Sequence, residues 1–385
     1  MSESPHVAPA SLVAALGDRQ DEVTSGDGVL AVNAALDALA ELPLLSSSLG
    51  LRSHWLKYVR EVVVELGDRC PDSIEIRMLA AISRAALMAH QTSPGLATAE
   101  HALNRATESG DVEGQLLVLA GRLPMLAHMA PVEANRDLRQ IDVDWQELVA
   151  ARGPNLSDSD LWLQAELLLA RLAYHAATGD MALMRIELAE LGRLPLPRRP
   201  ALSFVAYASQ ALLLQMWLRE GHYERAERAA DDAIELCEQE AAWVEVANLC
   251  AVRSALALLS GRVRVAVDTA RRGVAAAARS PIRDQQPDPW LGLPFDVCPG
   301  KTPAQAIQVM AESVLSAQDQ SDATAFLVAA LGMCAYYLAD DRALEALDAL
   351  NEASQVAKGL ADASPAPLLR HAAEQLLGYL GILRQ

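Results

Sequence analysis

The chain has 385 residues and a formal net charge of −18, and 52% of its residues are apolar although only 4% are aromatic. A chain this acidic repels phosphate groups, so nucleic acid and anionic membranes are excluded as expected partners. Alanine and leucine dominate while strand-forming residues are sparse, which predicts a nearly all-α protein with a large core.

The cysteines and the first residues indicate a cytoplasmic protein. Five cysteines, at positions 70, 237, 250, 298 and 334, include no CxxC pair, and this favours free thiols in a reducing compartment. Residues 1–27 lack the basic and apolar stretches of a secretory signal. Because they mix Ser, Pro, Gly, Asp and Glu, we expect a disordered arm there. Only three lysines are present, and the use of arginine instead is typical of a high-GC bacterial genome.

Apolar residues recur at helical spacing from Val29 onward. The spacing predicts helices over residues 29–42, 53–69, 74–90, 94–108, 113–129, 132–151, 158–177 and 181–191. Ser157 followed by Asp160 has the pattern of a helix N-cap. Residues 193–200 contain three prolines and are predicted to form an extended joint. We interpret the uncharged runs 201–218 and 323–339 as buried helices rather than membrane spans.

Residues 204–278 are predicted to form two successive helical hairpins. Gly221 and Gly261 mark their turns, and a small residue follows each turn by five positions, where two helices would cross closely. Gly179 and Asp341 occupy matching turns. The steps between the four turns are 42, 40 and 80 residues, so we expect a period near 40 with one further repeat before Asp341.

This pattern resembles the second half of a tetratricopeptide (TPR) repeat, in which a turn glycine is followed by an aromatic residue and then by small residues. The hairpins are longer than the roughly 34 residues of that family, and the first half of its signature is absent. The resemblance is therefore to long, divergent TPR-like repeats, and it is strongest over residues 160–278 and 323–358. It implies a right-handed superhelical stack of antiparallel helix pairs, an α-solenoid.

We expect four regions on this basis: a disordered arm at residues 1–27, N-terminal hairpin repeats at 28–152, TPR-like repeats at 153–358, and a C-terminal capping helix at 359–385. A Pro-rich loop at residues 280–300 interrupts the repeats, and it carries the apolar residues Trp290, Leu291 and Phe295. Two interpretations stay open. The loop covers exposed core, or it occupies the groove of the solenoid or contacts a partner.

Motifs for catalysis, nucleotides and metals are missing from the sequence, and the eight histidines are dispersed. Asp231, Asp232 and Glu235 match the DDxxE pattern of class I terpene cyclases, but the companion motif would end in Lys358 instead of a carboxylate. We interpret these acids as a solvated helix face. An arginine strip is interpreted in the same way, with docking of an acidic partner as the alternative; it contains Arg262, Arg264, Arg271, Arg272, Arg279 and Arg283. We expect no catalytic residue, metal or cofactor.

The leading hypothesis is a non-enzymatic scaffold, adaptor or regulatory subunit that binds an apolar or amphipathic segment of another protein or peptide in the concave groove. A homo-oligomer is compatible with the same surface. The candidate partner-binding residues are Gln210, Gln215, Arg219, Asn248, Arg253, Trp290, Leu291 and Phe295. Two alternatives are a ligand-sensing regulatory module, which predicts an enclosed apolar pocket, and an all-α enzyme with a cavity near residues 280–300.

Overall fold

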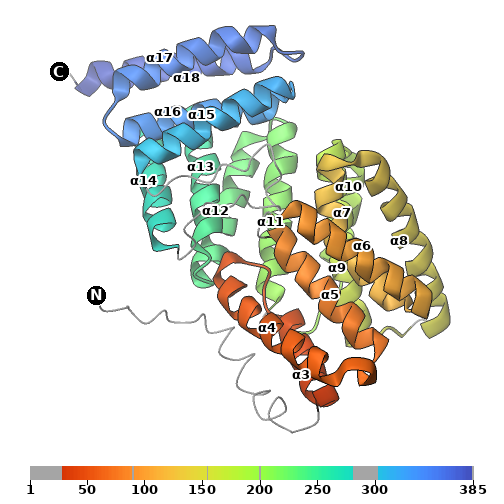
Figure 1. Cartoon of the computed structure of the whole chain (residues 1–385). Helices are drawn as coiled ribbons and strands as arrows, with labels where there is room; N and C mark the ends of the chain where they lie inside the picture. The colour runs from red at the N-terminus through yellow and green to blue at the C-terminus, as the bar shows by residue number, and fades with distance from the viewer. Residues whose placement is uncertain (1–27, 89–90, 154, 199–200, 281–301, 384–385) are drawn as a thin grey trace, which may run out of the picture. The chain divides into compact units, whose positions relative to one another are not determined.

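A computed structural model describes residues 28–88, 91–153, 155–198, 201–280 and 302–383 (Figure 1). Within these ranges the regular elements are all helical, so the predicted all-α class is confirmed. The predicted arm at 1–27 and residues 281–300 of the Pro-rich loop lie outside the described residues. The α-helices are α3 (Gly28–Glu41), α4 (Leu49–Leu66), α5 (Asp72–Met88), α6 (Thr92–Ser109), α7 (Val112–Met129), α8 (Pro131–Arg152), α9 (Asp158–Thr178), α10 (Met181–Leu191), α11 (Leu202–Arg219), α12 (Tyr223–Gln239), α13 (Trp243–Leu259), α14 (Val263–Arg279), α15 (Pro303–Asp319), α16 (Ala323–Ala339), α17 (Ala343–Val356) and α18 (Pro365–Leu383).

Local signals in the sequence place several helix ends correctly. At the start of α9 the Ser157 hydroxyl accepts from the Asp160 backbone N–H at 3.2 Å, and the Asp160 carboxylate accepts from the Ser157 backbone N–H at 2.9 Å. This reciprocal pair satisfies two backbone donors that a helix start leaves without partners. The C-terminal helix α18 lies within the region 359–385 in which a terminal helix was predicted.

The chain divides into two compact units, residues 1–209 and 210–385, and the boundary falls within α11. The boundaries predicted at residues 152 and 358 separate different kinds of repeat. The division into compact units does not test that distinction, so these boundaries stay predictions. No described helix combines the length and apolar character that crossing a membrane requires.

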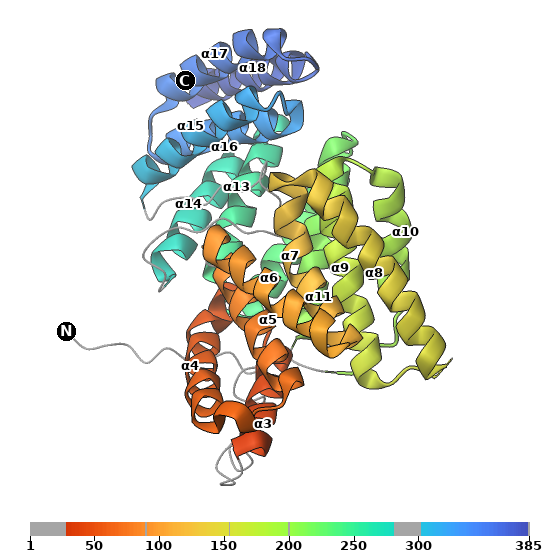
Figure 2. The same cartoon turned by 45° about the vertical axis from the view of Figure 1, so that its right-hand side comes forward.

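Unit 1 is built from antiparallel helix pairs whose first members pack side by side. The pairs α5–α6, α7–α8 and α9–α10 are each in contact, and α7 also packs against both α5 and α9 (Figures 1 and 2). One core joins α7, α8 and α9 around Leu123, Ile141 and Leu167. A second core joins α3, α4 and α5 around Leu36, Val59 and Ile74.

Unit 2 repeats one helix and one turn with a fixed step. Helices α12, α13 and α14 begin at residues 223, 243 and 263, and α15, α16 and α17 begin at residues 303, 323 and 343, so successive starts lie 20 residues apart within each set. The predicted period near 40 is therefore two helix–turn steps. Helix α15 lies in the interval where one further repeat was expected before Asp341, but the turn of that repeat, near residue 301, falls outside the described residues, so this repeat stays a prediction. This chain is a helical-repeat protein.

The turns of unit 2 share one backbone geometry. The middle residue of each three-residue turn has a positive φ between 53° and 72°, and the next N–H donates to the carbonyl five residues earlier at 2.8–2.9 Å. These hydrogen bonds satisfy carbonyls at the end of each helix, as in a Schellman motif. The residues with positive φ are Gly221, Ala241, Gly261, Ser321 and Asp341. The turns predicted at Gly221, Gly261 and Asp341 are thereby confirmed.

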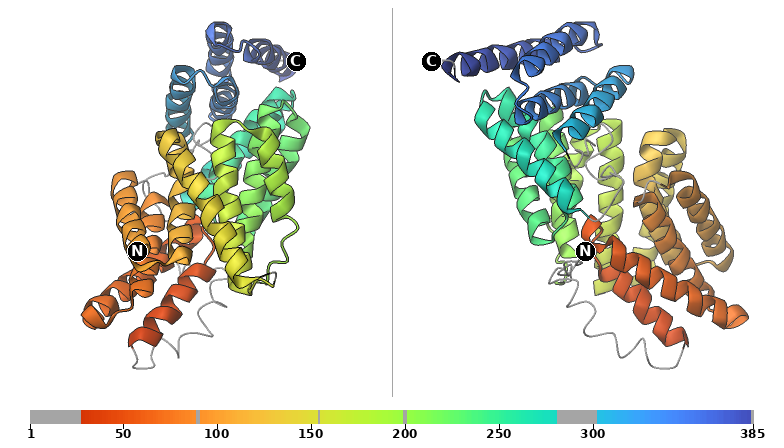
Figure 3. Two further views of the ribbon diagram at one scale, coloured as in Figure 1. Left: turned by 90° about the vertical axis from the view of Figure 1, so that its right-hand side faces the viewer. Right: turned by 60° about the vertical axis from the view of Figure 1, so that its left-hand side comes forward.

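Helix α13 is the centre of unit 2, because every residue from Val244 to Leu259 is buried. It contacts α12, α14 and α16, and Figure 3 shows α15–α18 running across the direction of α13 and α14. Gly273 allows the close approach of α14 to α16, whereas Gly332 would leave a Cβ in ordinary van der Waals contact. A Cβ added at Gly273 would lie 2.6 Å from the Tyr336 hydroxyl, and one at Gly332 would lie 3.7 Å from the Ala251 carbonyl. The apolar runs predicted to be buried helices correspond to α11 and α16.

Candidate functional site

The residues predicted to line the groove are mostly buried within unit 2. Gln215, Asn248 and Arg253 are 3%, 0% and 8% exposed. Arg253 forms ion pairs with Glu227 and with Asp231, the latter with an Nε–Oδ1 distance of 2.7 Å. These ion pairs connect α13, which carries Arg253, to α12. The role of Arg253 in partner binding stays a prediction.

Two of the other predicted residues, Arg219 and Gln210, lie on α11. Arg219 at the end of α11 pairs with Asp322 at an Nη2–Oδ2 distance of 3.2 Å, and Gln210 is half-buried. Trp290, Leu291 and Phe295 lie outside the described residues.

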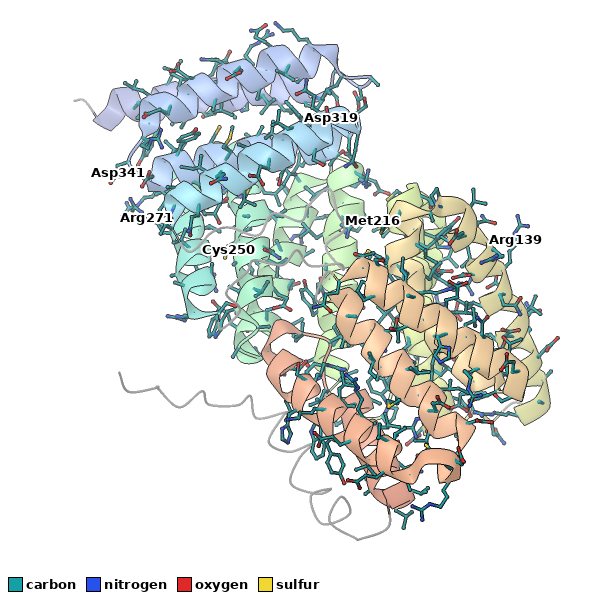
Figure 4. The ribbon with its side chains drawn as sticks, in the orientation of Figure 1. Arg139, Met216, Cys250, Arg271, Asp319 and Asp341 are labelled. Carbon is teal, nitrogen blue, oxygen red and sulfur yellow. The ribbon has the colours of Figure 1, made fainter. Side chains whose placement is uncertain are left out.

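The arginine strip on α14 is largely paired within unit 2. Arg271 donates to Asp341 at 3.4 Å (both residues are labelled in Figure 4), and Arg272 pairs with Glu238 at 2.7 Å. Arg262 pairs with Glu227, and the Arg279 guanidinium lies 4.9 Å from the centre of the Trp243 ring. Four arginines of the strip thus have partners, Arg264 is exposed, and Arg283 lies outside the described residues, so the solvated helix face stays an interpretation.

The acidic motif on α12 does not form a metal centre in the part of the chain that the structure describes. Asp231 is paired with Arg253, while Asp232 and Glu235 are exposed. No group of three or more histidine, cysteine or acidic side chains with metal-binding geometry occurs among the described residues. Three of the four described cysteines are buried, and burial raises the pKa of the Cys250 thiol to about 12.

A pocket in unit 1 is the most developed candidate site. Its cavity volume is about 110 Å³, and helices α3, α4, α5, α7, α9 and the start of α11 contribute to it. Most of the lining is aliphatic or aromatic, with three arginines and one glutamate among the apolar side chains. The lining residues are Leu36, Leu39, Ala40, Leu42, Leu44, Arg52, Arg77, Ala80, Ala81, Arg84, Leu117, Trp162, Glu166, Leu169, Ala201, Phe204 and Val205.

Arg52 is the unusual member of this lining. Its side chain comes from the first turn of α4 and is only 8% exposed. Its Nε donates to the Ser48 hydroxyl at 3.1 Å and its Nη2 donates to the Leu42 carbonyl. Its Nη1 has no hydrogen-bond partner, and the guanidinium forms no ion pair, among the residues that the structure describes. Burial first, and the nearby positive charge of Arg84 second, lower the pKa of Arg52 to about 9.

The other two arginines of the pocket each have a carboxylate partner. Arg77 donates to Asp37 at 2.6 Å, and Arg84 donates to Glu166 at 3.1 Å. Three guanidinium groups and two carboxylates leave one positive charge, and Arg52 is the group without an ion pair among the described residues, although the charge of Glu166 also acts on it. The arrangement can hold a small molecule with one negative charge and an apolar remainder.

The sequence gives only a weak signal for this pocket. Arg52, Arg77 and Arg84 lie on two helices, and each separately fits the polar positions of an amphipathic helix. The signal that sequence analysis missed is the environment of Arg52, an arginine placed directly after the apolar and small residues of segment 42–51. Only the tertiary structure shows that it points into a pocket.

Comparisons with known proteins add no function. No family model matches the chain, and no curated protein matches it. Among solved structures, a circular tandem repeat protein with novel repeat topology and enhanced subunit contact surfaces is 13% identical, with a TM-score of 0.22, and the match covers 95% of this chain and 94% of that one. An engineered protein is 16% identical, with a TM-score of 0.23, and the match covers 95% of this chain and 98% of that one. At these TM-scores neither likeness carries an argument, and the assignment as a helical-repeat protein rests on the helices and turns described above.

Proposed function

We propose that this protein is a non-enzymatic, TPR-like helical-repeat regulator that binds a small organic anion in the pocket of unit 1. The observation that carries the proposal is the buried guanidinium of Arg52, which lines the pocket without a carboxylate partner among the described residues. A buried charge without a counter-charge destabilises a protein by several kcal/mol. A bound anion would supply the counter-charge.

The pocket is suited to binding rather than to catalysis. Glu166 is the only carboxylate among its described lining residues, and that carboxylate is engaged by Arg84. General acid–base chemistry commonly uses a histidine or two carboxylates of different pKa, and the described lining offers neither. This comparison favours the ligand-sensing alternative over the enzyme.

Ligand binding would connect helices that belong to different pairs. Arg52 belongs to α4, Arg84 to α5, Trp162 and Glu166 to α9, and Phe204 to α11. A ligand that contacts all of them stabilises the conformation in which these helices surround it, by mass action. This is the physical basis on which the pocket could regulate the surface that unit 1 offers to a partner.

The test uses the full chain and two methionine variants of α4. Arg52→Met removes the pocket charge, whereas Arg60→Met removes an exposed arginine from the same helix. We expect organic anions to raise the melting temperature of the natural protein and of Arg60→Met, and to leave Arg52→Met unchanged. The absence of any anion-dependent shift in the natural protein, with its tryptophan fluorescence also unchanged, would refute the proposal.

A second candidate function, binding of a protein segment, is favoured by the outer face of α8. Val132 and Val143 are 84% and 50% exposed, and Arg136 and Arg139 lie between them on the same stripe without an ion pair among the described residues. Figure 4 shows Arg139 on the outer side of this helix. Apolar residues flanking two cations fit an acidic amphipathic helix.

This second function is tested with a fluorescein-labelled acidic amphipathic peptide and charge reversal. We expect the paired variant Arg136→Glu with Arg139→Glu to lose at least tenfold in affinity by fluorescence anisotropy. Arg264→Glu, at an exposed position on α14, is the control and should bind as the natural protein does. Equal binding by the paired variant and the control would exclude the α8 face.

A further inference from the structure

We infer that the ligand of the unit 1 pocket is a short aliphatic monocarboxylate of about four to six carbons, with its carboxylate at Arg52 and its chain against the leucines. This inference rests on the proposed function and names the class of ligand. Three independent properties of the pocket lead to it: its net charge, its volume and the kinds of atoms that line it.

The charge of the pocket selects a monoanion. Asp37 and Glu166 already neutralise Arg77 and Arg84, with donor–acceptor distances of 2.6 Å and 3.1 Å. Only the charge of Arg52 is left. A phosphate or a dicarboxylate would bring a second negative charge beside the carboxylate of Glu166, where a partly buried site offers no cation to balance it.

The position of the free donor fixes the carboxylate end. Arg52 uses Nε and Nη2 to bind the Ser48 hydroxyl and the Leu42 carbonyl, which holds the guanidinium in one orientation. Its Nη1 is left to donate to a ligand. A guanidinium held in place in this way binds a carboxylate at a smaller loss of side-chain entropy than a mobile arginine does.

The volume limits the size of the chain. A buried apolar cavity of about 150 Å³ takes up benzene, a molecule of six carbons. The unit 1 pocket has a cavity volume of about 110 Å³, which is smaller. A carboxylate of four to six carbons, with its head group toward the arginines and its tail in the cavity, matches this space, and an eight-carbon chain exceeds it.

The lining favours an aliphatic acid over a hydroxylated one. Apart from the arginines, Glu166 and Trp162, the described lining consists of leucine, alanine, valine and phenylalanine. None of these side chains can donate to or accept from a hydroxyl group. A hydroxyl group away from the arginines, Glu166 and Trp162 would therefore be buried without a partner, whereas an aliphatic chain gains from leaving water.

The experiment is isothermal titration of the full chain with pentanoate, pentanamide, octanoate, phosphate and citrate. We expect pentanoate to bind at least tenfold more tightly than its neutral isostere pentanamide and than each of the other three probes. Arg52→Met should abolish pentanoate binding. Because Arg52→Met also loses two internal hydrogen bonds, Ala81→Met provides a second test of the pocket. Ala81→Met fills the pocket but retains the charge of Arg52, and it should also abolish binding. Arg60→Met should bind pentanoate as the natural protein does.

The outcomes separate this inference from the proposed function. Tighter binding of phosphate, citrate or octanoate that is lost in Arg52→Met would overturn the ligand class and leave the anion pocket standing. Equal binding of pentanoate and pentanamide would overturn both, because the charge of Arg52 would play no part. An adventitious site elsewhere would show as pentanoate binding that persists in both Arg52→Met and Ala81→Met, and that result would also overturn both.

Discussion

Replacing Gly273 with alanine tests the packing at the centre of unit 2. The added Cβ would lie 2.6 Å from the Tyr336 hydroxyl and 3.0 Å from the Cβ of Cys250. Both neighbours are fully buried, on α16 and α13, so neither side chain can move into solvent to make room. The substitution therefore forces apart three helices that contact one another.

The expected loss of stability is estimated by comparison with a glycine at which an added Cβ would contact no other atom. Alanine at Gly378 in α18 would meet no atom within 4 Å. Both substitutions gain up to about 1 kcal/mol from the higher helix propensity of alanine. Only Gly273→Ala also pays for overpacking, which costs about 1–3 kcal/mol in a well-packed core. The difference between the two variants should therefore be about 1–3 kcal/mol.

The assay is thermal unfolding followed by circular dichroism. A difference of about 2 kcal/mol corresponds to roughly 4–8 °C in melting temperature for a unit of this size. Tyr336→Phe removes the closest contact, so it should recover part of the loss when combined with Gly273→Ala. Equal melting temperatures for Gly273→Ala and Gly378→Ala, or no recovery in the double variant, would refute the close packing of α14 against α13 and α16.

Three further predictions concern other parts of the fold. Asp137→Asn should destabilise unit 1 by about 3–5 kcal/mol in urea unfolding, because it breaks a buried ion pair in which two nitrogens of Arg122 each lie 2.6 Å from a carboxylate oxygen of Asp137. A loss of stability below about 1 kcal/mol would contradict this prediction. Burial raises the pKa of Asp144, so the folded state opposes its ionisation. Asp144→Asn should therefore raise the melting temperature at pH 7, and the gain should fall as the pH drops through the carboxylate range; a gain that persists at low pH would count against this cause. Ala241→Gly should stabilise unit 2 by about 1 kcal/mol because Ala241 has a φ of 53°, and Gly221→Ala, at a φ of 72°, should have the opposite effect.

Short-range signals in the sequence determined the helices and many of their ends. The cap formed by Ser157 and Asp160 and the turns at Gly221 and Gly261 depend on residues within a few positions of one another. The backbone hydrogen bonds of a helix and its caps are equally local, so the residue types near each end are sufficient to predict them.

The turns at Ala241 and Ser321 show where such signals stop. Neither residue type favours a positive φ, yet both adopt the turn geometry of Gly221, with the following N–H donating to the carbonyl five residues earlier. The fixed length of the helices on either side, and the packing of those helices in the stack, hold the turn in place. The sequence therefore predicted only the period near 40 residues, whereas the structure shows that each period consists of two 20-residue helix–turn steps.

The pocket was decided by the tertiary structure alone. Its charge balance depends on Arg52, Arg84 and Glu166, and Arg84 and Glu166 are separated by 82 residues in the chain. Their types and positions in the sequence give no sign that Arg84 and Glu166 would pair and that Arg52 would be left without an ion pair among the described residues. Local sequence fixes where each helix begins and ends, but the electrostatic environment of a side chain depends on which helices the fold brings around it.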